Sequence, residues 1–272
     1  MLAAIFGNGD LPIILSQQLI QDKTPFIAIC FDTDNYRKIH SLKSGNLVFH
    51  LSSIDIKQII FYIAKHNVSQ AVICGGVRFK GLESIKVPFS KILYLIYAFF
   101  SYNKGDNFLL NVAAKMLKAQ GVNLIGVHEI IPQILTKQID NINLSLASSY
   151  HKNIKLGVNI LNYNSLFDIG QSVVVQDGRV LGIEAVEGTD ALITRCGMLK
   201  NDLKQKPILI KMPKIGQNMK LDMPTIGLQT IQNLVNGGYA GLVVKNESLI
   251  FLDKERCKEL LKQNEMFLKV LD

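Results

Sequence analysis

Short apolar runs that each stop at glycine mark the first third of the chain, and they restrict the folds open to it. Residues 2–6 are followed by Gly-Asn-Gly at 7–9, and residues 70–74 are followed by Gly-Gly at 75–76. Buried runs of this length, separated by helical patterns, are typical of a parallel sheet with helices on both faces. Because the carboxyl ends of parallel strands share one edge, we expect the two glycine turns to lie side by side.

The same alternation predicts the rest of an α/β, Rossmann-like domain over residues 1–132, followed by a polar linker at 133–150. The expected elements in chain order are a helix that opens at Pro12, strands at 26–31 and 47–51, a helix at 53–65 capped by Ser53, helices at 89–101 and 106–119, and a strand at 122–126.

From residue 150 the pattern changes to mixed elements joined by glycine-bearing loops, which predicts an α+β domain over residues 151–272. The expected elements are a helix at 150–167, a hairpin of strands 172–176 and 180–186 around Asp177-Gly178, a helix at 190–196, a strand at 208–212, a helix at 228–236 and a closing hairpin-like pair near 240–252.

The net charge of +8 comes from 30 basic and 22 acidic residues, and 25 of the cations are lysines. Clustered arginine interleaved with aromatic residues, the footprint of a nucleic-acid-binding surface, is missing from the sequence. We therefore favour solvated surface lysine and expect no nucleic-acid partner. One local excess differs: Lys200–Lys220 holds six lysines and one acid, which suits a small anionic ligand.

The four cysteines, Cys30, Cys74, Cys196 and Cys257, lie far apart with no C-x-x-C pair, which disfavours a zinc site and a disulfide framework. Buried thiols in a reducing cytosol fit this spacing. The N-terminus lacks the basic region and cleavage site of a signal peptide. The longest apolar stretch, Ile92–Phe100, is about half as long as a membrane span. We expect a soluble, cytoplasmic protein.

The turn at 7–9 resembles the start of a dinucleotide-binding fingerprint, but Pro12 stands where the third glycine belongs. Two interpretations stay open: a helix N-terminus that meets phosphate, with Arg78 and Lys80 nearby, or a tight turn that needs glycine backbone angles. The histidines do not suggest a nucleophilic triad, and only His128, near the domain junction, is a candidate for a functional role.

Carboxylates beside glycine and proline recur in the second half, within 168–171, 184–190 and 211–227. Mg²⁺ takes one or two carboxylates and completes its coordination shell with water and substrate phosphate, so these strings suit a magnesium site. Lysines in the third string supply the complementary charge for a phosphate. A solvated charged loop is the alternative explanation.

These strings carry a resemblance to a known family. F-D-I-G-Q at 167–171, A-V-E-G-T-D-A at 185–191, K-M-P-K-I-G-Q at 211–217 and L-D-M-P-T-I-G at 221–227 resemble motifs of the UDP-2,3-diacylglucosamine pyrophosphatases of the lipid A pathway, the family unrelated to the calcineurin-like phosphoesterases. Motifs of the first half are also in family order: G-x-G-x-L-P at 7–12, G-D at 105–106 and G-x-H-E at 126–129.

The resemblance implies a Mg²⁺-dependent hydrolase that cleaves UDP-2,3-diacylglucosamine into 2,3-diacylglucosamine 1-phosphate (lipid X) and UMP, with water attacking the phosphorus on the sugar side. It also implies that the second domain is catalytic and that the acylated UDP-sugar sits in the cleft between the domains. A non-catalytic nucleotide-sugar-binding protein is the alternative from another functional class.

By resemblance, Asp222 is the catalytic residue. We expect Asp222 to bind the magnesium ion or to position the water, and Asp190 and Glu187 to complete the magnesium site. The expected substrate-binding residues are Gly9, Leu11, Gly75 and Gly76 of the first domain and Asp168, Gln171, Gly188, Thr189, Lys211, Lys214 and Gln217 of the second. The chain departs from the family at Asn107 and Asn218, where acids are expected, and at Lys220, where arginine is common.

The stretch Ile92–Phe100 has two open roles. Core packing is the first, and a slot for acyl chains that touches the inner leaflet is the second. A transient contact with the inner-membrane surface, and a homodimer, stay open as partners.

Overall fold

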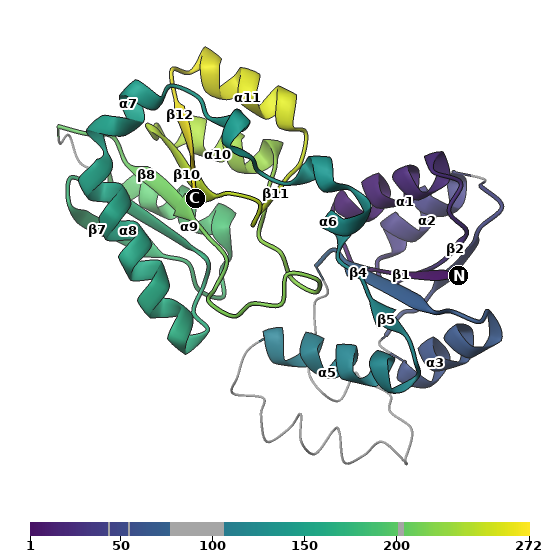
Figure 1. The fold of residues 1–272 in the computed structure, drawn as a ribbon. Coiled ribbons are helices and arrows are strands. Elements are labelled where there is room, and N and C mark those ends of the chain that lie inside the picture. Colours follow the sequence, from purple (N-terminus) through teal and green to yellow (C-terminus); the bar gives the residue numbers. More distant parts are fainter. Residues whose placement is uncertain (43, 54, 77–105, 201–203) are drawn as a thin grey trace. The chain divides into compact units, whose positions relative to one another are not determined.

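The computed structural model describes residues 1–42, 44–53, 55–76, 106–200 and 204–272. The chain divides into two compact units (Figure 1). The first unit contains residues 1–132 together with 218–222, and the second unit contains residues 133–217 and 223–272. The expected helix at 89–101, the cations Arg78 and Lys80, and the stretch 92–100 lie outside the described residues.

The first unit is built on a five-stranded parallel sheet of order β3-β2-β1-β4-β5. The strands are β1 (Leu2–Phe6), β2 (Phe26–Cys30), β3 (Leu47–His50), β4 (Gln70–Cys74) and β5 (Asn123–Leu124). The chain moves outward from β1 to β3 and then returns to the other side of β1 at β4. This Rossmann-like order confirms the predicted fold, and its topological switch point lies between β1 and β4.

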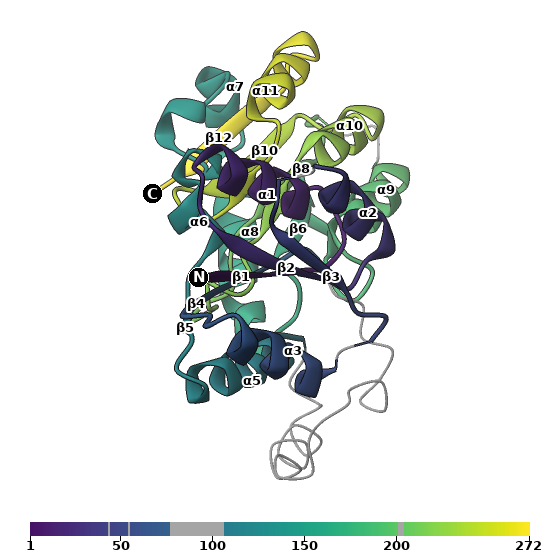
Figure 2. The ribbon, with the colours of Figure 1, turned by 90° about the vertical axis from the view of Figure 1, so that its right-hand side faces the viewer.

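Helices cover both faces of this sheet, with α1 and α2 on one face and α3 and α5 on the other (Figure 2). Their bounds are α1 (Leu11–Gln21), α2 (Thr33–Ser41), α3 (Ile56–Lys65) and α5 (Asp106–Ala119), and the short α6 (Val127–Ile130) follows β5.

Two details of the first unit differ from the sequence-based expectation. The cap of α3 is Asp55, whose carboxylate accepts from the Gln58 amide at 3.1 Å, and not Ser53. Helix α2 was not predicted, because it buries only Asn35 and Ile39 and so has almost no apolar period.

The second unit contains a mixed five-stranded sheet of order β12-β10-β8-β6-β7. The strands are β6 (Ser172–Gln176), β7 (Arg179–Ile183), β8 (Ile208–Lys211), β10 (Gly241–Lys245) and β12 (Phe267–Leu271). Strands β12, β10 and β8 are parallel, whereas β6 is antiparallel to both β8 and β7. The predicted hairpin at Asp177-Gly178 is confirmed, and both turn residues have positive φ, as such turns require.

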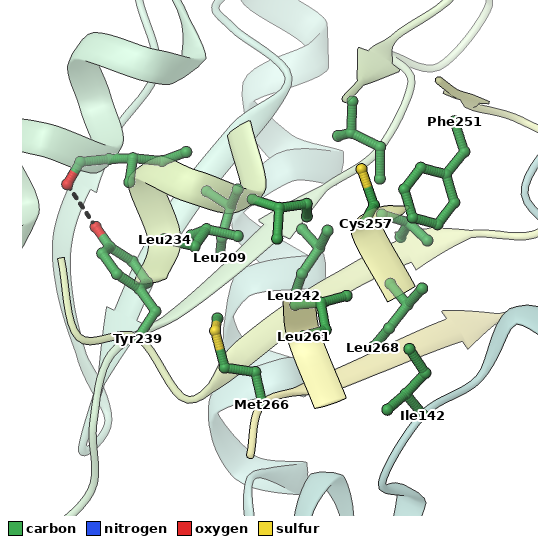
Figure 3. Close-up of a cluster of buried hydrophobic side chains, with 14 of the residues drawn as sticks. Ile142, Leu209, Leu234, Tyr239, Leu242, Phe251, Cys257, Leu261, Met266 and Leu268 are labelled. Atoms are coloured by element: carbon green, nitrogen blue, oxygen red, sulfur yellow. Dashed lines mark hydrogen bonds between the residues drawn. The ribbon is translucent and has the colours of Figure 1, made fainter. Parts of the chain in front are cut away.

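The two faces of the second sheet carry different helices. Val173, Val175, Ile208 and Ile210 pack against α7 (Leu144–Ser149) and α8 (His151–Asn164). The alternate strand residues pack against α9 (Thr189–Leu199), α10 (Leu228–Asn236) and α11 (Lys254–Gln263). Figure 3 shows side chains on this second face, where the Tyr239 hydroxyl donates to the Ile193 carbonyl at 2.8 Å.

The predicted hairpin-like pair near 240–252 is wrong. Strand β10 lies between β8 and β12, while β11 (Ile250–Phe251) pairs in parallel with β9 (Thr225–Ile226) in a separate small sheet. Two neighbouring apolar runs look like a hairpin in the sequence, but nothing local shows that their partners are distant strands. Helix α11 and strand β12 were also not predicted.

Residues 133–150, where the sequence suggests a linker, belong to the second unit. The segment contains short 3-10 helices at 132–134 and 138–140 and then α7. The Thr136 amide donates to the Leu249 carbonyl at 2.9 Å, and the Ile142 amide donates to the Leu268 carbonyl at 2.9 Å. These backbone bonds join the segment to the distant C-terminal elements.

All four cysteines are buried and free, as expected from their spacing. Burial, together with nearby Asp32, raises the pKa of the Cys30 thiol to about 12, and burial with nearby Asp253 raises the pKa of the Cys257 thiol to about 11. These thiols are therefore packing groups and not nucleophiles at neutral pH. Across the described ranges, no helix is long and apolar enough to cross a membrane.

Candidate functional site

The two glycine turns of the first unit lie against each other, as the sequence predicts. The Asn8 amide donates to the Gly76 carbonyl at 2.8 Å, and the Gly76 amide donates back to the Asn8 carbonyl at 3.2 Å. A Cβ atom at Gly75 would lie 2.5 Å from the Asn8 carbonyl oxygen, and Gly75 has a φ of +85°. Only glycine permits both the approach and the angle. The turns thus meet at the switch point between β1 and β4.

A buried asparagine secures the first of these turns. The Asn35 side-chain amide on α2 donates to the Gly7 carbonyl at 2.8 Å and to the Gly9 carbonyl at 3.0 Å. Leu11, an expected substrate contact, is buried at the first position of α1, so its side chain belongs to the packing of this unit. At Gly9, by contrast, a Cβ atom would meet no heavy atom of the described residues within 4 Å.

The segment 218–222 packs on the first unit, although it follows most of the second unit in the chain. Leu221 is buried in the first unit's core. The Lys220 ammonium lies 3.1 Å from a Glu129 carboxylate oxygen and donates to the Leu124 carbonyl at 3.2 Å. The Gly126 amide, and then Lys220, hold the pKa of Glu129 below its usual value. Asp222 ends this segment and therefore belongs to the first unit.

Two further positions named from the sequence also lie in the first unit. The His128 Nδ1 atom is buried beside Gly126, and no residue that the structure describes offers it a hydrogen-bond partner. Asn107 lies in the first turn of α5, where the side chains are outside the described part of the chain.

In the second unit, seven of the expected substrate-binding residues gather at one edge of the mixed sheet. This edge is formed by the start of β6, the end of β7, the end of β8 and the N-terminus of α9. The seven residues there are Asp168, Gln171, Gly188, Thr189, Lys211, Lys214 and Gln217.

Thr189 is the centre of this cluster. Its hydroxyl accepts from the Lys211 ammonium at 2.6 Å and donates to a Glu184 carboxylate oxygen at 2.9 Å. The second Glu184 oxygen accepts from the Gln171 amide at 3.2 Å, and the Ser172 hydroxyl lies 3.4 Å from that of Thr189. Lys211 is only 6% exposed. A buried cation and a carboxylate thus share one hydroxyl at the sheet edge.

A second cation, Lys214, is held beside this network. Its ammonium lies 2.6 Å from an Asp168 carboxylate oxygen and 3.0 Å from the Asp168 carbonyl. Its amide donates to the Gln217 side-chain oxygen at 2.9 Å. The Gln171 side-chain oxygen is buried here without a hydrogen-bond partner among the described residues. The site therefore offers cations that suit an anionic group, and an unsatisfied amide oxygen that suits a hydrogen-bond donor of the same ligand.

Comparison with known proteins assigns the chain to a family. The model described as "LpxI N-terminal domain" matches residues 1–134, and the model described as "LpxI C-terminal domain" matches residues 142–269. The chain belongs to the LpxI family. It is 31% identical over 157 residues to the UDP-2,3-diacylglucosamine pyrophosphatase LpxI of Caulobacter vibrioides. That alignment covers 56% of this chain and 56% of the relative, so the chain matches about half the length of the relative.

The acids expected to hold magnesium in this LpxI-family chain differ in their surroundings. Glu187 accepts from the Arg195 guanidinium at 2.9 and 3.2 Å, and its own amide and then Arg195 hold its pKa below the usual value. Asp190 accepts from the Thr230 hydroxyl at 3.3 Å. Asp222 belongs to the first unit, whereas Glu187 and Asp190 belong to the second.

The carboxylates of Asp190 and Asp222 each have the oxygen donors that a magnesium ion takes, and such an ion needs only one or two protein carboxylates. Glu187 fits less well, because Arg195 already neutralises it and would repel a cation. Within the described residues, no three His, Cys, Asp or Glu side chains form a metal-binding group.

Glu184 is a further polar residue of this site in the LpxI-family chain, and it has no role among those expected from the sequence. It is the first acid of the string 184–190, and its carboxylate binds both Thr189 and Gln171. A signal was present, because Glu184 directly follows β7 and so stands at the same sheet edge as the end of β8. That edge becomes visible only once β6 is known to be antiparallel to β8.

Proposed function

We propose that this chain hydrolyses the pyrophosphate of UDP-2,3-diacylglucosamine, with magnesium, to give 2,3-diacylglucosamine 1-phosphate and UMP in lipid A synthesis. One observation carries the proposal: the two LpxI domain models together match residues 1–134 and 142–269, and the relative in Caulobacter vibrioides is named for this activity. The cation-bearing sheet edge of the second unit supports it, because a pyrophosphate diester is an anion.

In the proposed step, a water oxygen bonds to the phosphorus on the sugar side. The bond from that phosphorus to the bridging oxygen breaks, UMP leaves with the bridging oxygen, and the proton of the attacking water passes to bulk water. Negative charge on the phosphoryl oxygens must be offset during this exchange. Lys211 and Lys214 are assigned this task, and Lys214 would exchange its Asp168 partner for phosphate.

We assign the magnesium ion to Asp222 and Asp190, and when bound it would neutralise phosphoryl charge. Thr189 and Glu184 would hold the Lys211 ammonium in place for the substrate. The placement of the whole site in a cleft between the domains stays a prediction.

The test is to incubate the full chain with the acylated UDP-sugar, Mg²⁺ and isotopically labelled water, and to follow UMP release. We expect the label in the sugar 1-phosphate and not in UMP. Asp222→Asn keeps the size of the side chain and removes its charge, so we expect turnover to fall by a factor of about 10² or more. Asp34→Asn, at a position whose side chain is 79% exposed, is the matched control and should leave turnover unchanged.

Three results separate the alternatives. Label in UMP would refute attack at the sugar-side phosphorus. Near-normal turnover of Asp222→Asn would refute its assigned role. Tight binding of the UDP-sugar without any UMP release would favour a non-catalytic nucleotide-sugar-binding protein.

A further inference from the structure

Large apolar side chains are exposed at the last turn of α8 and in the 3-10 turn, Ser165–Phe167, that follows it. Tyr163, Leu166 and Phe167 are 72%, 73% and 74% exposed, and Ile169 beside them is 39% exposed. Positions 163, 166 and 167 are three and four residues apart, so they share one side of the final helical turns. Single exposed apolar residues are common on proteins, but a contiguous group marks an interaction surface. We name these four residues the α8 tip.

The tip continues an exposed stripe that runs the length of α8. Lys152, Lys155 and Asn159 precede Tyr163 at helical spacing, and all are exposed. On the opposite side of the helix, Gly157 lets the backbone approach the sheet, since a Cβ atom there would lie 2.6 Å from the Ile210 side chain. The stripe therefore faces away from the sheet that α8 covers.

The segment that forms this surface carries charge of one sign, and the acid nearest its start from another element is Asp177, beside Tyr150. No Asp or Glu occurs from residue 141 to residue 167, a stretch that includes all of α7 and α8. Lys152 and Lys155 stand on the stripe itself. The next acid, Asp168, is paired with Lys214. A helix with lysines at one end of its outer face and tyrosine, leucine and phenylalanine at the other has the composition of helices that lie on anionic membranes.

We propose that the outer stripe of α8 docks on an anionic phospholipid bilayer, with the α8 tip inserted among the lipids and Lys152 and Lys155 on the headgroups. The stripe is about 20 Å long, so the helix must lie along the surface for both ends to touch it. Apolar burial drives the insertion, and attraction to anionic lipid orients the helix. This surface differs from the stretch 92–100, which suggests membrane contact from sequence alone.

Vesicle binding by the full chain tests the proposal without substrate, so the result is independent of the proposed hydrolysis. The probes are phosphatidylcholine vesicles with and without phosphatidylglycerol, in a sedimentation assay. We expect binding to the anionic vesicles. Omitting phosphatidylglycerol removes the attraction of Lys152 and Lys155 to the lipid, and the loss of each attraction should weaken binding about fivefold. Leu166→Ser with Phe167→Ser should weaken binding by at least about tenfold.

A matched control stands on the other face of the same sheet. Met198 and Leu199 at the end of α9 are also adjacent and exposed, at 79% and 54%, so replacing both with serine should leave binding unchanged. Both double variants should keep the thermal midpoint of the parent, because exposed positions contribute little to stability. An unchanged midpoint shows that any loss of binding is not unfolding.

The chain has no tryptophan, which permits a direct measure of insertion. Phe167→Trp should show a blue shift of its emission on anionic vesicles and quenching by brominated lipid, whereas Met198→Trp should show neither. The proposal is overturned if the parent chain does not bind anionic vesicles, or if the tip double variant binds them as strongly as the parent does. It is also overturned if the tip variant instead dissociates a dimer that does not bind vesicles, since a second copy would then cover the tip.

Discussion

Asp140 holds the segment 133–150 in the second unit, and its removal is the sharpest test of that architecture. The carboxylate is 2% exposed and lies 3.0 Å from the Lys254 ammonium and 3.7 Å from the Lys258 ammonium of α11. It also accepts from the Lys137 amide at 2.8 Å. Asp140→Ala therefore leaves two partly buried cations and one amide without this acceptor.

We expect Asp140→Ala to cost about 3 kcal/mol of unfolding free energy in the second unit. Removing one partner of a buried ion pair typically costs about 3–5 kcal/mol. The lower end applies because Lys254 keeps a bond to the Leu135 carbonyl at 2.8 Å and Lys258 keeps Glu255 at 3.7 Å. For a unit of this size, the loss lowers the thermal midpoint by about 10 °C.

Urea unfolding followed by circular dichroism measures the total effect, and hydrogen exchange at the Thr136 and Ile142 amides locates it. Glu255→Ala is the matched control, because Glu255 also contacts Lys258 but is 82% exposed, and it should cost no more than about 0.5 kcal/mol. The reasoning is refuted if Asp140→Ala costs no more than Glu255→Ala, or if exchange at the two amides does not rise.

Two further predictions concern the first unit. Gly75→Ala should cost more than about 2 kcal/mol of unfolding free energy, measured in urea, because its Cβ would clash with a backbone oxygen of the facing turn. Gly45→Ala is the control: Gly45 has a similar positive φ but open space among the described residues, so this change should cost about 1 kcal/mol. Equal costs for the two variants would exclude the clash. The Gly126 amide and then Lys220 lower the pKa of Glu129, so the stabilising contribution of its pair with Lys220 is complete above the ordinary carboxylate pKa and is lost as the pH falls through the lowered value. Hydrogen exchange of segment 218–222 should rise in that window, whereas in Glu129→Gln it should already be high at neutral pH, and an unchanged profile would refute the role of the pair.

Much of the fold follows from local pattern. Strands β1, β4 and β6 and helices α5 and α10 have the bounds that their sequences predict. These segments are continuous apolar runs or have a clear helical period, so the local signal and the tertiary environment agree. Helices α2 and α11 bury only two residues each on polar sequences, and their apolar period is too weak to predict.

Some residues of the candidate site could also be predicted from local sequence, and others could not. The motif residues of the second unit were predicted, and the structure gathers Gln171, Thr189, Lys211 and Lys214 at one edge. The role of Glu184 could not be predicted, because its contact with Thr189 depends on the path of the turn from β7 into α9 and no sequence spacing indicates that path.

Residue patterns alone predict the Rossmann-like alternation, the meeting of the two glycine turns and the hairpin at Asp177-Gly178. Each depends on residues close together in the chain, or on the ends of parallel strands that must share one edge. The folded chain, in contrast, is needed to show that Leu221 and Lys220 anchor a piece of the second half on the first unit, together with Asp222. Leu221 is buried in the core of the first unit and Lys220 pairs with Glu129, so this segment packs on the first unit although it follows most of the second unit in the chain. Neither the core around Leu221 nor the partner of Lys220 can be identified from the five residues themselves.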